Sequence, residues 1–206
     1  MREALLIIDI QPDFLPGGAL GVEGGDRTLP VINAHLRRAD LAFATADYHP
    51  SDHGSFASAH PGKKPGDVVD LNGIAQVLWP DHCVQRTPGA MLSEKLERQH
   101  LRGLVYKGTR SHIDSYSGFF ENDRRTATGL HEVLQALKVE KLLIMGIATD
   151  YCVRATVMDA LALGYKVRVD ASGCAGVNLS PGDADHALME MESAGAEVFR
   201  SLDDAT

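Results

Sequence analysis

The residues best suited to chemistry centre on Cys152, within the segment KLLIMGIATDYCVRA at residues 141–155. Its first half, residues 142–147, is a short uninterrupted apolar run, which is typical of a strand buried on both faces of a parallel sheet. Thr149 is a suitable N-cap, and apolar residues recur at helical spacing over residues 151–164. We therefore predict a strand, a tight turn and a helix, with Cys152 in the first helical turn. The helix dipole and unpaired backbone N–H groups there lower the pKa of a thiol, which favours a catalytic thiolate.

Three charged residues, Asp9, Asp47 and Lys107, also lie at or just beyond the carboxyl ends of predicted strands. These strands are predicted at residues 3–10, 40–46 and 104–107. In an open parallel sheet the carboxyl ends share one edge, where ligands bind. A lone cysteine is more often a small buried hydrophobe, and a lone acid or lysine at a strand end is usually solvated. Four such residues at one edge favour a catalytic site over four separate structural roles.

The sequence Asp47-Tyr48-His49 is a possible metal-ligand pair. In extended backbone, residues two apart point to the same side, so one carboxylate and one imidazole could bind the same ion. Spacing alone does not choose a third ligand among His53, His60 and His82. The alternative is that these are loop histidines bonded to backbone or water.

The remaining candidates have packing as their default interpretation. Cys83 and Cys174 do not occupy a strand-to-helix turn, so we interpret both as packing residues. Four aromatic side chains are either ordinary core residues or the wall of a ring-binding pocket. They are Phe14, Trp79, Tyr116 and Phe119.

Strands and helices alternate along the whole chain. Helices are predicted at residues 27–38, 90–101, 128–137 and 181–194, and further strands at residues 166–170 and 197–199. Residues 50–81 and 113–120 are predicted as loops, as is the glycine-rich segment 16–25, which lacks the context of a phosphate-binding motif. The alternation predicts an α/β fold, a three-layer α/β/α arrangement with a mostly parallel central sheet, Rossmann-like.

Length and composition are those of a soluble globular protein. The 206 residues suffice for a single domain, and we find no linker that would divide residues 1–206. A net charge of −8 provides no basic surface for nucleic acid or an anionic membrane, and a small uncharged ligand fits better. No apolar run approaches the ~20 residues that span a bilayer. Three cysteines, an odd number without disulfide spacing, lead us to expect free thiols and a cytoplasmic location.

Five segments together resemble the nicotinamidases of the isochorismatase-like cysteine hydrolase superfamily, in the order found there. The segments are LLIIDIQPDFLPGGAL, DYHPSDHGSFAS, LWPDHCVQRTPGA, KGTRSHIDSYSGFF and GIATDYCVRATVMDA. The last is similar to the nucleophile turn of the superfamily, whereas DYHP with WPDHCVQ is similar to the metal site of the nicotinamidase branch.

The resemblance implies a catalytic triad of Asp9, Lys107 and Cys152. It also implies a cis peptide between Ile147 and Ala148, which would aim the backbone N–H groups of Ala148 and Cys152 at the oxyanion of the reaction. A metal ion would be held by Asp47, His49 and His82, so the resemblance selects His82 over His53 as the third ligand. Ring-binding residues would be Phe14, Trp79 and Tyr116.

The activity implied by the resemblance is hydrolysis of nicotinamide to nicotinate and ammonia through a cysteine thioester, in NAD salvage. Deamidation of pyrazinamide would accompany it. The alternatives are another superfamily amidase or hydrolase, acting on a ureido or carbamoyl compound or on isochorismate, and a redox protein that uses Cys152 as a sensor thiol. The implied cofactor is one divalent metal, Zn²⁺ first, with Fe²⁺ or Mn²⁺ as alternatives. The implied partner is the small-molecule substrate, and a homo-oligomer is compatible.

Overall fold

A six-stranded parallel sheet forms the centre of the protein, in a computed structural model that describes residues 1–201. The strand order is β5-β2-β1-β6-β7-β8, and all five neighbouring pairs are parallel. The strands are β1 (Arg2–Ile8), β2 (Ala42–Asp47), β5 (Gly103–Lys107), β6 (Val139–Ile147), β7 (Lys166–Ala175) and β8 (Glu197–Phe199). The predicted fold class is confirmed.

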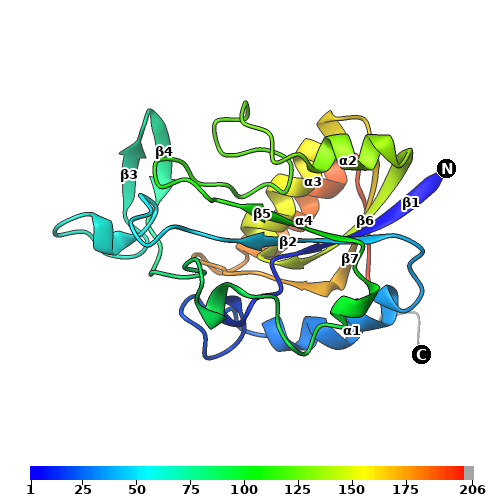
Figure 1. Cartoon of the computed structure of the whole chain (residues 1–206), viewed down its shortest axis with the longest axis horizontal. Helices are drawn as coiled ribbons and strands as arrows, with labels where there is room; N and C mark the ends of the chain where they lie inside the picture. The colour runs from blue at the N-terminus through cyan, green and yellow to red at the C-terminus, as the bar shows by residue number, and fades with distance from the viewer. Residues whose placement is uncertain (202–206) are drawn as a thin grey trace.

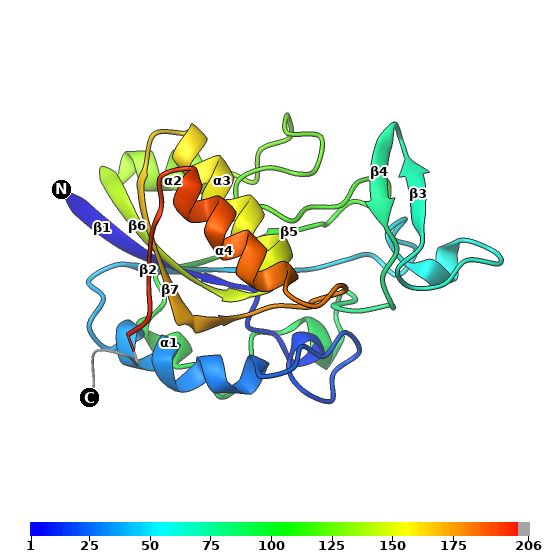
Figure 2. The ribbon, with the colours of Figure 1, turned by 180° about the vertical axis from the view of Figure 1, so that it is seen from behind.

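Helices cover both faces of the sheet and make the outer layers of the sandwich (Figures 1 and 2). One face carries α1 (Thr28–Leu36), and the other carries α2 (Leu130–Ala136), α3 (Arg154–Ala162) and α4 (Asp183–Ser193). The central strand β1 serves both cores, because Leu6 and Ile8 pack on the side of α3 whereas Leu5 and Ile7 pack on the side of α1. Burial on both faces explains why such strands read as continuous apolar runs. None of the helices within residues 1–201 is long and apolar enough to cross a membrane.

The segment predicted as a long loop, residues 50–81, contains an antiparallel hairpin of β3 (Val68–Leu71) and β4 (Ile74–Val77). It stands apart from the main sheet in Figure 1. Its turn is Asn72-Gly73, and both residues have positive φ angles, 53° and 84°. That geometry is typical of a two-residue type I′ turn, for which Asn-Gly is the preferred sequence.

The helix predicted for residues 90–101 is wrong. The chain instead forms two short 3₁₀ turns, Pro88–Ala90 and Arg98–His100, separated by an irregular stretch that buries Leu92 and Leu96. The backbone N–H of Ser93 donates to the carbonyl of Ile10 at 2.8 Å, a contact that a helix would replace with its own ladder. Tertiary packing therefore overrides the local helical pattern.

Strand β7 is longer than the predicted strand at residues 166–170 and extends through Cys174. The pairing of β6 with β7 shifts register between Ile144 and Gly146. Gly146 has a φ of 141°, and a Cβ there would lie 2.1 Å from the carbonyl oxygen of Ile8. Only glycine allows β1 and β6 to approach this closely. Beyond that point β6 ends at Ile147, immediately before the segment that carries Cys152.

Candidate active site

Cys152 lies where the chain leaves the central strand β6 and enters α3. The strand-to-helix turn is confirmed, but its first turn, Thr149–Val153, is π-helical. Ala148 takes the N-cap position without a side-chain hydrogen bond, so the expected cap at Thr149 is wrong; that side chain is buried instead. The peptide between Ile147 and Ala148 is cis, in agreement with the resemblance. Cys152 itself is buried, with 6% of its surface exposed.

The four residues predicted at strand ends meet at one edge of the sheet, around the ammonium of Lys107. Its Nζ lies 2.9 Å from Oδ2 of Asp9 and 3.5 Å from Sγ of Cys152. It also donates to the carbonyl of Ser115 at 2.9 Å and forms an ion pair with Asp47. The structure therefore brings together the acid, the lysine and the thiol that the sequence singled out.

The electrostatics of this cluster differ from the prediction of a lowered thiol pKa. Burial raises the pKa of the Cys152 thiol well above its usual value, and the opposing effect of Lys107 does not overcome it. Burial also raises the pKa of Asp9 from 3.8 to about 6, although Lys107 acts to lower it. The carboxylates of Asp47 and Asp9 hold the pKa of Lys107 well above its usual range despite burial. A thiol with a raised pKa becomes a nucleophile only when a base removes its proton.

Asp9 is placed to be that base. The Thr45 hydroxyl donates to Oδ1 of Asp9 at 2.7 Å, which leaves Oδ2 facing Lys107. Oxygens of the Asp9 and Asp47 carboxylates and Sγ of Cys152 all lie within 4.8 Å of one another. A carboxylate with a raised pKa, close to a neutral thiol and a permanent cation, is suited to accept and return a proton.

Asp47, His49 and His82 form a buried group whose ligand atoms lie within 4.8 Å of one another. Nδ1 of His49 donates to the carbonyl of Gly108 at 2.8 Å, and Nδ1 of His82 donates to that of Pro80 at 2.7 Å. Their Nε2 atoms face Oδ2 of Asp47, at 3.5 Å and 3.9 Å. Backbone carbonyls thus fix the tautomer that leaves each Nε2 lone pair free for a metal. One carboxylate oxygen and two imidazole nitrogens are a ligand set that fits a divalent metal ion.

A second group within the same distance limit comprises His49, His53 and Asp114. Both ring nitrogens of His53 have partners, since Nδ1 lies 2.6 Å from the Ser55 hydroxyl and Nε2 3.2 Å from the carbonyl of Ile113. The first group therefore offers the better ligand set. His60, the third alternative, belongs to neither group and bonds the carbonyl of Gly54 instead.

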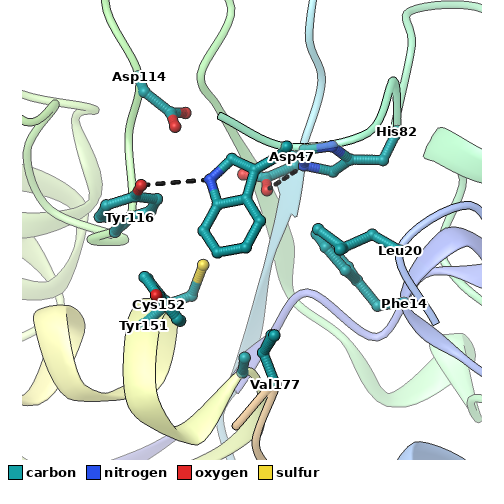
Figure 3. A pocket seen from close by; sticks show the side chains of 11 residues that line it. Phe14, Leu20, Asp47, His82, Asp114, Tyr116, Tyr151, Cys152 and Val177 are labelled. Carbon is teal, nitrogen blue, oxygen red and sulfur yellow. Dashed lines mark hydrogen bonds and ion pairs between the residues drawn. The ribbon is translucent and has the colours of Figure 1, made fainter. Parts of the chain in front are cut away.

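A pocket connects the thiol to the possible metal ligands (Figure 3). Figure 3 shows Phe14 and Leu20 on one side and Tyr116 on the other. Its lining consists of Phe14, Leu20, Asp47, Trp79, His82, Asp114, Tyr116, Ala148, Tyr151, Cys152 and Val177. Trp79 packs edge-on against Tyr151 at 4.9 Å between ring centroids.

Three of the four aromatic candidates line this pocket, whereas Phe119 is a core residue stacked on Tyr165. The sequence interpretation missed four lining residues: Leu20, Asp114, Tyr151 and Val177. The Tyr151 position next to the nucleophile was a usable signal. Leu20 and Val177 come from irregular segments in which no pattern marks them.

The fold and the site together define a class of protein. A parallel sheet that carries a buried cysteine, lysine and aspartate at its carboxyl edge, beside a pocket, has the architecture of a cysteine hydrolase. The isochorismatase domain family matches residues 3–203, and the chain belongs to this family. The resemblance inferred from the five sequence segments is confirmed.

Curated relatives and solved structures carry a narrower description. The chain is 47% identical to a nicotinamidase of Escherichia coli, over 97% of this chain and 95% of the relative. It is 41% identical to a nicotinamidase of Acinetobacter baylyi, over 96% and 92%. The structure of an Acinetobacter baumannii nicotinamidase and pyrazinamidase superposes with a TM-score of 0.94 at 38% identity, covering 98% of this chain and 97% of that one.

Proposed function

We propose that this protein hydrolyses nicotinamide to nicotinate and ammonia through a thioester on Cys152, as a step of NAD salvage. One observation carries the proposal: the pocket joins a thiol, lysine and carboxylate cluster to a group of two imidazoles and a carboxylate. A flat heteroaromatic amide needs both groups: the thiol cluster for its carboxamide, and the imidazoles and carboxylate, with a metal, for its ring nitrogen. The nicotinamidase relatives support the same substrate, and pyrazinamide, which shares the flat ring and the carboxamide, is proposed as a second one.

In the proposed mechanism Asp9 takes the proton of the Cys152 thiol, and the ammonium of Lys107 stabilises the thiolate. The sulfur attacks the carboxamide carbon and forms a tetrahedral oxyanion. The backbone N–H groups of Ala148 and Cys152 are proposed to stabilise it, an interaction whose loss typically costs about 10²- to 10³-fold in rate. Asp9 returns the proton to the nitrogen, so that the C–N bond breaks and ammonia leaves.

The second half of the reaction reuses the same carboxylate. Asp9 takes a proton from water, which attacks the thioester carbon and releases nicotinate, and the proton returns to the Cys152 sulfur. A pKa of about 6 suits a group that gains and loses a proton twice in each turnover near neutral pH. The atoms balance: one amide and one water become one carboxylic acid and one ammonia.

The metal ion is proposed to bind Asp47, His49 and His82. Bound there, it would orient the ring by attracting the pyridine nitrogen, either directly or through water. Zinc is the proposed ion, because one carboxylate and two imidazoles suit it. The structure of the pyrazinamidase of Pyrococcus horikoshii, which was solved with zinc, supports this choice. That protein is 35% identical, over 97% of this chain and 99% of that one, with a TM-score of 0.76. Fe²⁺ and Mn²⁺ are the alternatives for the same donors.

Phe14, Trp79 and Tyr116 are proposed to hold the substrate ring. Their side chains line the pocket between the thiol and His82, and they offer apolar faces to a flat neutral ring. A cytoplasmic location is proposed because Cys152 must remain a free thiol. All of these roles are supplied by one chain, so the proposed site does not depend on oligomeric state, and a homo-oligomer is compatible with it.

The test is ammonia release from nicotinamide, measured in the same sample as metal content. We expect turnover by the metal-loaded protein and loss of turnover in Cys152→Ala. A folded wild-type protein with one metal per chain that releases no ammonia from nicotinamide would rule out the proposed substrate. Release of ammonia from a carbamoyl compound by that sample would favour another amidase activity.

A further inference from the structure

Gln76 lies behind the pocket wall, on the hairpin strand β4, and does not line the pocket itself. Only 1% of its surface is exposed. Its Nε2 lies 2.9 Å from Oδ2 of Asp114 and 3.0 Å from the hydroxyl oxygen of Tyr116, and both of these residues line the pocket. The same nitrogen lies 2.7 Å from the carbonyl oxygen of Val77.

The contacts continue from Gln76 to the aromatic wall. Nε1 of Trp79 donates to the Tyr116 hydroxyl oxygen at 3.3 Å, the interaction drawn between the indole and Tyr116 in Figure 3. Asn122 holds the backbone of Tyr116, because its Oδ1 accepts from the Tyr116 backbone N–H at 3.0 Å. The Asn122 amide also faces Oε1 of Gln76 at 3.5 Å. One buried amide thus links the hairpin directly to two residues of the pocket wall, Asp114 and Tyr116, and through Tyr116 to Trp79.

An amide suits this position better than any other side chain of its size. Its N–H groups can face a carboxylate and a phenol oxygen together, while its carbonyl faces the Asn122 amide. A carboxylate of the same shape would repel Asp114, and an apolar side chain would leave buried oxygens without a donor. Because Gln76 contacts Asp114 and Tyr116 at once, and the Tyr116 hydroxyl also accepts from Trp79, the amide restricts where Tyr116 and Trp79 stand.

We propose that Gln76 is a positioning residue for substrate binding, which acts through Tyr116 and Asp114 to fix the wall that holds the substrate ring. This inference rests on the proposed function for its substrate, nicotinamide. Gln76 touches neither the thiol nor the three proposed metal ligands, so it should affect binding of the ring more than the chemical step.

Gln76→Met keeps the length of the side chain and removes both donors. We expect the KM for nicotinamide to rise about tenfold, which corresponds to about 1.4 kcal/mol, while kcat changes less than about threefold. Trp79 is the only tryptophan of the chain, so its emission reports the wall directly. If Tyr116 moves away from Trp79, the tryptophan emission should shift, and acrylamide should quench it more strongly. Both effects should appear without substrate.

Asn72→Ala is the matched control. Asn72 lies at the tip of the same hairpin, and its Nδ2 donates to the carbonyl of His112 at 2.6 Å, in the same connection that carries Asp114 and Tyr116. It touches no residue of the pocket. We expect wild-type KM and wild-type tryptophan emission in Asn72→Ala, because it removes one hydrogen bond at the hairpin tip and leaves the contacts of Gln76 in place.

Gln76→Glu is the second variant, and it keeps the experiment decisive if Gln76→Met does not fold. The introduced carboxylate faces Asp114, so KM at neutral pH should rise at least as far as in Gln76→Met. The proposal is overturned if the folded Gln76 variants keep wild-type KM and emission, or if Asn72→Ala changes both as much. A wild-type protein inactive on nicotinamide would refute the proposed function alone, because the emission comparison still tests the position of the wall.

Discussion

Asp9→Asn should make the protein more stable while it abolishes turnover. Asn resembles the protonated form of Asp9 in shape, and it removes a buried charge that the fold holds at a cost. A pKa raised from 3.8 to about 6 corresponds to about 3 kcal/mol at 1.36 kcal/mol per pKa unit. Because the folded state binds this proton more tightly than the unfolded chain does, ionisation of Asp9 destabilises the fold. The cost appears as the pH rises from about 4 to about 6 and is complete above that.

The measurement is urea unfolding of chelator-treated wild type and Asp9→Asn at pH 5 and at pH 7. We expect a gain of about 3 kcal/mol in the free energy of unfolding at pH 7 and roughly half of that at pH 5. Asp40→Asn is the control, since Asp40 is exposed and its substitution should change stability little at either pH. Equal stability of Asp9→Asn and wild type at pH 7, with equal m-values, would refute the assignment of a costly buried charge to Asp9.

Three further outcomes test the site. The kcat/KM for nicotinamide should fall about tenfold per pH unit below about pH 6, because protonated Asp9 cannot accept the thiol proton; a flat profile down to pH 5 would exclude Asp9 as the base. Cys152→Ala should lose turnover yet bind nicotinamide by calorimetry, whereas Cys83→Ala should retain activity; residual turnover in the first variant would remove Cys152 from the mechanism. His82→Ala should lose most of its metal, whereas His53→Ala should weaken binding by no more than about 10- to 100-fold, measured as metal per chain after dialysis; the reverse order would overturn the ligand assignment.

The edge that carries the candidate site was predictable because it follows from a general property of parallel sheets. Buried strands are visible as apolar runs, and their carboxyl ends must share an edge, so Asp9, Asp47, Lys107 and Cys152 could be placed together without coordinates. The hairpin was less visible, although Asn72-Gly73 was a usable turn signal. The contact of the hairpin with the site was not predictable. The position of Gln76 against Tyr116 depends on how residues 50–81, which leave the main sheet, fold back onto the pocket.

The wrong predictions share one cause, the use of a local rule where tertiary contacts decide. Residues 90–101 have a helical pattern, but the burial of Leu92 and Leu96 and the bond from Ser93 to Ile10 hold them in another form. The thiol of Cys152 was expected to have a lowered pKa from its place at a helix start. Burial among carboxylates outweighs that effect, and neither the burial nor the carboxylates are local to the helix.

Lys107 explains how the protein can bury two acids and a thiol at one point. Its ammonium forms ion pairs with both Asp9 and Asp47, and it reaches the sulfur of Cys152, so a single cation compensates for the charge of two carboxylates. The compensation is unequal: the pKa of Asp47 is lowered, with Lys107 and His49 as the main causes against burial, whereas that of Asp9 remains raised. Two carboxylates that share one lysine thereby differ in proton affinity. Asp47 stays ionised, as its proposed role as a metal ligand requires, and Asp9 remains able to exchange a proton, as its proposed role as the base requires.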